Sequence, residues 1–222
     1  MKPSGLSRPG ARARRRFLGF AAVGLVALGF SLGAGARAQT MFPIDQLMAP
    51  GPLPDMALGS ADAKVTIIEY ASMTCSHCAA FHETTWPALK AKYVDTGKVK
   101  FILREFPLDP LAAAAFMLAR CAGPDKRNAI VDMLYTQQSA WAFGDKPLEA
   151  LAGLVKQAGV SQADFESCLK DQALYDQVNQ TRERAAQAFK VSATPTFFVN
   201  GEEMNGELPI DAFDKVLEPL LK

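Results

Sequence analysis

An apolar, β-branched run that leads into a pair of cysteines constrains this 222-residue chain more than any other feature. The run "KVTIIEY", residues 64–70, predicts a buried strand. Cys75-Ser-His-Cys78 follows, and apolar residues then recur at helical spacing over residues 76–93. A second strand pattern, "KVKFILREF", occupies residues 98–106. These elements predict a βαβ unit over residues 65–106, with both thiols where the first strand passes into the helix.

The rest of the chain separates into a helical block and a closing strand region. Residues 107–190 hold no convincing strand, and their apolar residues recur at helical spacing. A strand pattern returns at residues 196–199, Asn200-Gly201 predicts a hairpin turn, and an amphipathic helix closes the chain. This order predicts an α/β fold in which helices flank a mixed central sheet.

Charge is unevenly distributed along the chain. The net charge is +1, yet residues 1–38 hold seven of the 24 basic residues and none of the acidic ones. The rest of the chain is therefore net acidic. This distribution is typical of a targeting segment and not of a nucleic-acid footprint, so we predict no nucleic-acid partner.

Residues 1–38 have the layout of an export signal. Basic residues end at Arg16, an apolar run follows, and Ala36-Arg37-Ala38 is a small-x-small cleavage site. We expect cleavage near Ala38 and export to the periplasm by the Sec route or, because "RRRFL" resembles the twin-arginine pattern, by the twin-arginine route. An uncleaved membrane anchor is the alternative. Residues 39–58, rich in Pro, Gly and Met, predict a loose lead-in segment.

Export changes the interpretation of the four cysteines, because an oxidising compartment allows disulfides to persist. At the start of a helix, unpaired N–H groups and the helix dipole stabilise a thiolate on Cys75. His77 can add a hydrogen-bond donor or a positive charge, and Cys78 lies about one turn into the helix. We therefore expect Cys75 to be the nucleophile and Cys78 to be the buried resolving thiol.

The size of the thiolate stabilisation on Cys75 bears on whether the cysteine pair oxidises or reduces other proteins. A pKa of about 3.5 for Cys75, against about 8.5 for a free thiol, would stabilise the thiolate at about pH 7 by about 5 kcal/mol. The free-energy gap between strongly oxidising and strongly reducing dithiols is about 7 kcal/mol. Thiolate stabilisation could supply most of this gap, and a histidine before the second cysteine points toward an oxidising disulfide.

Two other interpretations of the cysteine pair are open. A purely structural staple would stabilise little, because it closes only a four-residue loop. A zinc or copper site could use Cys75, His77, Cys78 and His82. Ligands at one helix start rarely complete a tetrahedron, however, and the sequence offers no second ligand cluster. We therefore predict neither a resident metal nor a cofactor.

The sequence resembles the DsbA-like branch of the thioredoxin superfamily. The resemblance rests on Glu69 in the first strand, on Cys75-Ser-His-Cys78, on the helical block and on "VSATPTFFVNG" after it. It implies a thioredoxin fold formed by residues 59–106 and 191–222, with an inserted all-helical domain over residues 107–190.

The resemblance also implies roles for residues outside the cysteine pair. Pro195 would be cis and face the disulfide, and Thr194 would offer its backbone to a substrate strand. Glu69 matches a buried acid that serves as a proton relay, with Arg104 as its nearest candidate partner; a solvent-facing Glu69 is the alternative. Ser76 replaces the proline that the best-known oxidases carry there, which moderates the expected oxidising power.

The remaining cysteines, Cys121 and Cys168, fall on separate predicted helices. In an exported protein we expect them to pair as a structural disulfide. The bridge would close a loop of about 47 residues and stabilise the fold by roughly 4 kcal/mol. Two buried free thiols are the alternative.

Together these features predict a periplasmic thiol:disulfide oxidase that donates the Cys75–Cys78 disulfide through a mixed disulfide at Cys75. The expected partners are reduced or misoxidised exported proteins and, by family analogy, a membrane redox protein that reoxidises the dithiol. A disulfide reductase or isomerase of the same fold is the alternative. A periplasmic copper- or zinc-handling protein is a more distant one.

Overall fold

The structure is a computed structural model that describes residues 40–222. The predicted export signal, its cleavage site near Ala38 and the choice of export route lie outside the described residues. The described residues belong to one compact unit. Within this part of the chain, no helix is both long and apolar enough to cross a bilayer.

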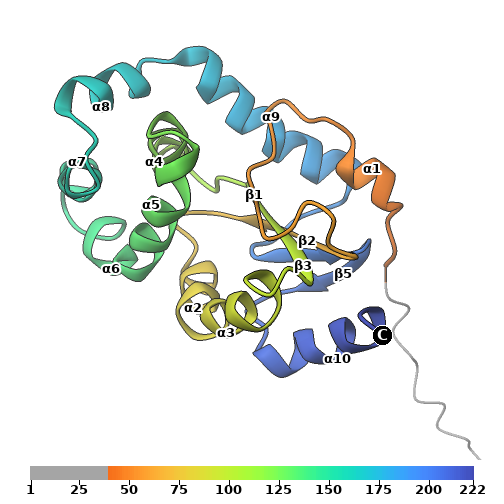
Figure 1. Ribbon diagram of the computed structural model, residues 1–222. Helices are drawn as coiled ribbons and strands as arrows, with labels where there is room; N and C mark the ends of the chain where they lie inside the picture. Colours follow the sequence, from red (N-terminus) through yellow and green to blue (C-terminus); the bar gives the residue numbers. More distant parts are fainter. Residues whose placement is uncertain (1–39) are drawn as a thin grey trace, which may run out of the picture. The chain divides into compact units, whose positions relative to one another are not determined.

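A mixed sheet of five strands forms the centre of this unit (Figure 1). The strand order is β1-β3-β2-β4-β5; the β2–β3 pair is parallel and the other three pairs are antiparallel. The strands are β1 (Ala57–Leu58), β2 (Val65–Ala71), β3 (Val99–Glu105), β4 (Thr196–Val199) and β5 (Glu202–Asn205). The predicted fold class, a mixed sheet flanked by helices, is confirmed.

Side chains alternate along the strands, so the two sides of the sheet face two separate cores. The first core receives Phe197 of β4. Phe81 and Phe213 pack on it, with ring centroids 4.7 and 5.1 Å from that of Phe197. The helices that supply these and neighbouring residues are α2 (Ser76–Thr84), α3 (Trp86–Leu89) and α10 (Ile210–Leu220).

The helical pattern that follows the cysteine pair is interrupted just before Pro87. α2 ends at Thr84 and α3 begins at Trp86, so that Pro87 lies in the first turn of the new helix. A proline there removes no intrahelical hydrogen bond, because the first N–H groups of a helix have no partner in it. A π-helical turn, η1 (Lys90–Val94), continues the chain toward β3.

The second core lies on the opposite side of the sheet. It contains Leu47, Ile68, Tyr70, Phe189 and Phe198, and its helices are α1 (Ile44–Met48) and α9 (Gln172–Ala188). The chain just before α1 runs beside the β4–β5 hairpin. The N–H of Phe42 donates to the carbonyl of Gly201 at 2.8 Å, and the N–H of Glu203 donates to the carbonyl of Thr40 at 3.0 Å. The described part of the expected loose lead-in is therefore ordered, because Leu47 and Phe42 complete this core.

The block between β3 and β4 is helical, as predicted. Besides α9 it comprises α4 (Pro110–Cys121), α5 (Pro124–Thr136), α6 (Gln138–Trp141), α7 (Pro147–Gln157) and α8 (Gln162–Leu169). Side chains of Asp109, Ser161 and Asp171 cap α4, α8 and α9 by accepting hydrogen bonds from backbone N–H groups. Figure 1 shows α4 to α6 beside the end of the sheet where β2 leads into α2.

A buried ion-pair cluster joins this helical block to the end of β3. Glu105 accepts hydrogen bonds from Arg120 of α4 at 2.7 and 3.0 Å and from Arg127 of α5 at 3.1 Å. Burial alone would raise the pKa of Glu105, but the two guanidinium groups hold it below its ordinary value. The cluster therefore fixes both helices to the strand that lies beside β2.

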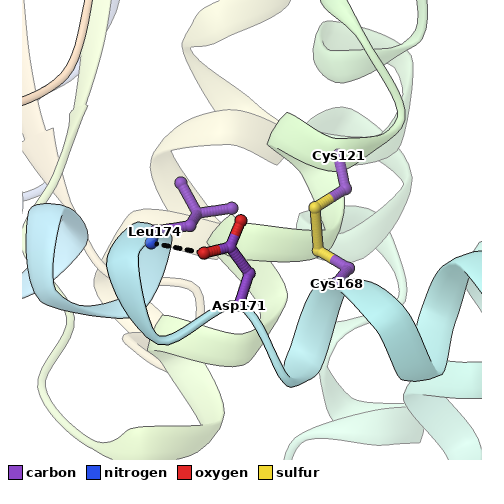
Figure 2. Close-up of a disulfide and its surroundings, with 4 residues drawn as sticks. All are labelled: Cys121, Cys168, Asp171 and Leu174. Carbon is purple, nitrogen blue, oxygen red and sulfur yellow. Dashed lines mark hydrogen bonds between the residues drawn. A yellow bond between two sulfur atoms is a disulfide. The ribbon is translucent and has the colours of Figure 1, made fainter.

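A disulfide links Cys121, the last residue of α4, to Cys168 of α8 (Figure 2). The S–S distance is 2.08 Å. Next to the bridge, the carboxylate of Asp171 accepts a hydrogen bond from the N–H of Leu174 at 2.9 Å and so begins α9. The bridge and the cap together fix the course of the chain from α4 through α8 into α9.

Candidate active site

Cys75 occupies the N-cap position of α2, directly after the β2 strand and its short connecting turn. Its backbone N–H donates to the carbonyl of Ser72 at 3.1 Å, and its own carbonyl accepts from the N–H of Ala79. Cys75 and Cys78 are both unpaired thiols. Cys75 is 8% exposed and Cys78 is 0% exposed. The sulfur of Cys75 is therefore the one that a partner can reach.

The environment of Cys75 favours its thiolate. The hydrogen bond with Cys78 is the main cause of a pKa lowered from an ordinary value of 9.0 to about 5. Burial opposes this effect, whereas the Thr194 side chain and the backbone N–H groups of Cys78 and His77 add to it. These N–H groups belong to the first turn of α2, where they have no helical partner.

Cys78 has the opposite character. Burial raises its pKa well above the ordinary value, and the hydrogen bond to Cys75 and the charge of Glu69 raise it further. The proton of the dithiol therefore resides on Cys78 while Cys75 carries the charge. This division suits an exposed nucleophile and a buried second thiol.

His77 lies at the surface and is held by a residue that the sequence did not indicate. Its Nδ1 lies 2.9 Å from Oε2 of Glu207, in the connection between β5 and α10. This hydrogen bond is the main cause that raises the pKa of His77, and the charge of Cys75 raises it further. Glu207 stands 130 residues from His77, so no local pattern could have identified it.

The Thr194–Pro195 segment faces the cysteine pair. The peptide bond between the two residues is cis. The carbonyl oxygen of Thr194 lies 3.3 Å from the Sγ of Cys75. The Thr194 hydroxyl is buried and has no hydrogen-bond partner among the described residues. The backbone carbonyl of Thr194 is thus directed at the nucleophilic sulfur.

Glu69 is fully buried, and its partner is His82 of α2. The Oε2 of Glu69 lies 3.0 Å from Nε2 of His82. The expectation that Arg104 would pair with Glu69 is wrong. In the parallel β2–β3 register Glu69 lies beside Leu103, whereas Arg104 lies beside Tyr70 and so points to the other side of the sheet.

Arg104 instead forms its hydrogen bonds on the side of the sheet that faces the second core. Its guanidinium donates to both carboxylate oxygens of Asp55, at 2.8 and 2.7 Å, and to the Tyr70 hydroxyl at 2.9 Å. A further hydrogen bond reaches the carbonyl of Leu47 at 2.8 Å. Arg104 therefore fastens the segment around α1 to the sheet and takes no part in the cysteine site.

The helical block contributes further residues to the site. Gln138 of α6 donates from Nε2 to the carbonyls of Met73 and Cys75 at 2.8 and 3.0 Å. Tyr135 of α5 stacks on the His82 ring, with centroids 4.2 Å apart and planes inclined by 20°. The apolar spacing of α5 signalled a core helix, but nothing in the sequence indicated which strand or helix it would meet.

The residues of the metal interpretation do not come together. His77 and His82 hydrogen-bond to two different carboxyl groups, one at the surface and one in the core. Over residues 40–222, no group of three or more His, Cys, Asp or Glu side chains is arranged to hold a metal ion. The geometry therefore favours dithiol chemistry for Cys75 and Cys78.

Comparison with known protein sequences agrees with this geometry. Residues 53–219 match the family model described as Thioredoxin. A protein from Rickettsia bellii, provisionally named a protein-disulfide oxidoreductase, is 36% identical over 148 residues, which cover 66% of this chain and 57% of the relative. A Rickettsia felis protein of the same name is 37% identical over 171 residues, which cover 74% of this chain and 60% of that relative. The chain thus spans less than two thirds of the length of these relatives.

Comparison with solved structures gives the same result. The crystal structure of Wolbachia pipientis alpha-DsbA1 superposes with a TM-score of 0.74 at 29% identity, covering 80% of this chain and 95% of that one. The fold is also that of oxidised BdbD from Bacillus subtilis, with a TM-score of 0.65 at 21% identity. The match covers 75% of this chain and 92% of that one. The chain therefore belongs to the thioredoxin superfamily, within its DsbA-like branch.

Proposed function

We propose that this chain is a protein-disulfide oxidoreductase that works as an oxidase and transfers the Cys75–Cys78 disulfide to other proteins. The observation that carries the proposal is the contrast between the two thiols, a Cys75 pKa of about 5 beside a Cys78 pKa raised by burial. A thiolate at Cys75 stabilises the reduced dithiol. A dithiol that is stable when reduced gives up its disulfide readily.

The reaction proceeds by two thiol–disulfide exchanges. A substrate thiolate attacks the Cys75 sulfur, the Cys75–Cys78 bond breaks, and Cys78 leaves as a thiolate that takes up a proton. A second substrate thiolate then attacks the substrate sulfur of the mixed disulfide, and Cys75 leaves as a thiolate. The two electrons that the substrate thiols lose when they form a disulfide reduce the Cys75–Cys78 disulfide to a dithiol.

Other residues of the site support these steps. His77, held by Glu207, places positive charge near the leaving Cys75 thiolate. Thr194 and Pro195 face the Cys75 sulfur, where a substrate chain must lie, and the Thr194 backbone would pair with it. The charge of buried Glu69 acts on Cys78, and Glu69 would exchange a proton with it.

The compartment and the partners follow from the chemistry. An oxidase of this kind works in the periplasm, where disulfides persist, on reduced or misoxidised exported proteins. Each cycle leaves the Cys75–Cys78 dithiol reduced, so a membrane redox protein would reoxidise it. The net acidic chain after residue 38 fits such protein partners better than nucleic acid.

A reductase or isomerase of the same fold is the second candidate, and Ser76 is the observation in its favour. Ser76 stands in place of the proline of the best-known oxidases and moderates the expected oxidising power. The two activities differ in the reduction potential of one dithiol, because an isomerase must be kept reduced in its compartment.

The reduction potential of the Cys75–Cys78 pair tests the proposal. The protein is equilibrated in glutathione buffers, alkylated, and each cysteine scored by mass spectrometry, so that Cys121 and Cys168 are read separately. A potential above about −160 mV is expected for an oxidase. A potential near about −250 mV would overturn the proposal and favour a reductase or isomerase function instead.

A further inference from the structure

A buried polar cluster with unused hydrogen-bonding capacity lies beneath Cys78. Glu69 and Cys78 are both 0% exposed, and the charge of Glu69 is one of the causes that raise the pKa of Cys78. One carboxyl oxygen of Glu69 bonds to Nε2 of His82, while Oε1 is buried and has no partner among the described residues. A buried polar atom left without a partner is destabilising and calls for an explanation.

The other nitrogen of the His82 ring points the opposite way. Nδ1 of His82 has no hydrogen-bond partner among the described residues and lies 4.0 Å from Oδ1 of Asp132 on α5. The Asp132 side chain is 51% exposed. His82 and Asp132 line an open surface cavity of about 250 Å³ together with Trp86, Pro87, Lys90 and Thr136. The His82 ring therefore connects the buried carboxyl of Glu69 to a cavity that water can enter.

We propose that His82 carries protons between Glu69 and the cavity at Asp132, so that Cys78 exchanges its proton with solvent by a route separate from the substrate side. The inference deepens the proposed function and rests on it. His82 lies one turn beyond Cys78 on α2, away from the Cys75 end that a substrate would cover. The mixed disulfide can thus block the front of the site without blocking proton exchange.

The proton balance of the exchange fits this route. When the Cys75–Cys78 bond breaks, the Cys78 thiolate takes a proton that the protonated Glu69 carboxyl supplies through a water molecule, because Oε1 of Glu69 makes no direct hydrogen bond to Cys78. Nε2 of His82 returns a proton to Glu69, and Nδ1 takes one from water at Asp132. Reoxidation runs the same transfers in reverse. An imidazole suits this task because one of its nitrogens can accept a proton while the other donates one.

The remaining groups around His82 are compatible with the route. Tyr135 of α5 stacks on the ring, and burial raises the pKa of its hydroxyl well above the ordinary value, so the phenol stays protonated. Lys90 of η1 lines the same cavity and acts on Asp132 through its charge. Glu69 and Asp132 therefore supply the two acidic groups, one on each side of His82.

The test uses the full mature protein in its oxidised form, mixed rapidly with a reduced dithiol peptide. His82→Gln keeps a hydrogen-bonding group beside Glu69 but cannot carry a proton between two atoms. We expect the rate of disulfide transfer to fall roughly 100-fold in this variant. Added imidazole, which the cavity can admit, should restore part of the rate. Asp132→Asn should slow the transfer several-fold, whereas Asp125→Asn, an exposed site on the same helix, should leave it unchanged.

Two results would overturn the inference. One is a His82→Gln protein that transfers disulfides at the wild-type rate. The other is a slowed His82→Gln protein whose rate and pH profile do not respond to imidazole, since this would make His82 a packing residue only. If His82→Gln does not fold, Asp132→Asn decides, and an unchanged rate and pH profile in it would reject the route. A wild-type protein that transfers no disulfide at all would reject the proposed function instead.

Discussion

The Sγ of Cys75 lies 3.3 Å from the carbonyl oxygen of Thr194, although 119 residues separate the two in the chain. The helical block fills most of that interval, and Gln138 within it binds the carbonyls of Met73 and Cys75. The site therefore depends on three segments that meet only in the folded chain. A change in any of them is expected to alter the chemistry of one sulfur.

The two thiols are predicted to have separable roles. Cys75→Ser should abolish disulfide exchange, because the reachable nucleophile is lost. Cys78→Ser should instead accumulate a mixed disulfide when it meets a peptide disulfide, because the Cys75 thiolate attacks that disulfide and no second thiol of the site can release the peptide. Non-reducing gels and mass spectrometry of each variant with a disulfide-bonded peptide read both outcomes. Exchange retained in Cys75→Ser would reject the assignment.

The stability of the reduced protein is predicted to depend on pH through Cys75. Its pKa is depressed in the folded state, from 9.0 to about 5. The resulting stabilisation is fully present above pH 9.0 and is lost as the pH falls through about 5. The full difference would be about 5 kcal/mol, but the sulfur is partly solvated, so we expect about 2 kcal/mol.

Denaturant unfolding of both redox forms between these pH values measures this effect. The oxidised protein has no Cys75 thiolate and serves as the control. The other thiol of the reduced form, Cys78, stays protonated in the folded protein over this pH range because its pKa is raised. A reduced-minus-oxidised stability that stays constant over this range would contradict the low pKa of Cys75.

His77→Ala is predicted to raise the pKa of Cys75 modestly. The imidazolium charge is lost, but the hydrogen bond from Cys78 and the backbone N–H groups of α2 remain. Titration of the thiolate absorbance in the ultraviolet checks the shift. Glu207→Gln should lower the pKa of His77, which nuclear magnetic resonance of the ring protons can follow. An unchanged Cys75 titration in His77→Ala would remove His77 from the mechanism.

The sequence predicted the elements of the site better than the contacts between them. The strand, the cysteine pair and the helix start are local patterns, so the placement of Cys75 at the N-cap of α2 could be predicted. The burial of Glu69 was left open and its partner was assigned wrongly to Arg104. That error came from register, because strand spacing alone does not show whether residue 103 or residue 104 faces position 69.

The sequence did contain a signal for His82, the true partner of Glu69. It stands four residues after Cys78, on the same face of one helix, and so must approach whatever lies beneath that thiol. The sequence analysis considered it only as a metal ligand. Glu207, Gln138 and Asp132 gave no comparable signal, because each reaches the site through tertiary packing of a separate segment.

Loss of the buried Glu105 charge is predicted to destabilise the protein strongly. Glu105→Gln leaves Arg120 and Arg127 with an uncharged partner in the core, which should lower the free energy of unfolding by about 3 kcal/mol. Since the folded pKa of Glu105 is depressed below 4.5, its contribution is present above that pH and is lost as the pH falls through the lower folded value. Glu149→Gln, an exposed site paired with Lys146, is the control and should change stability by less than about 0.5 kcal/mol.

The Cys121–Cys168 bridge is predicted to contribute to stability and not to disulfide transfer. Replacing both residues by Ser should lower the free energy of unfolding by roughly 4 kcal/mol, because the bridge spans 47 residues of the unfolded chain. The α4–α8 connection lies apart from Cys75, which contacts Cys78 and Thr194 instead. Denaturant unfolding and peptide oxidation at a temperature where the variant is folded check both statements. A double variant of native stability, or one that is folded but inactive, would show that the bridge acts in another way.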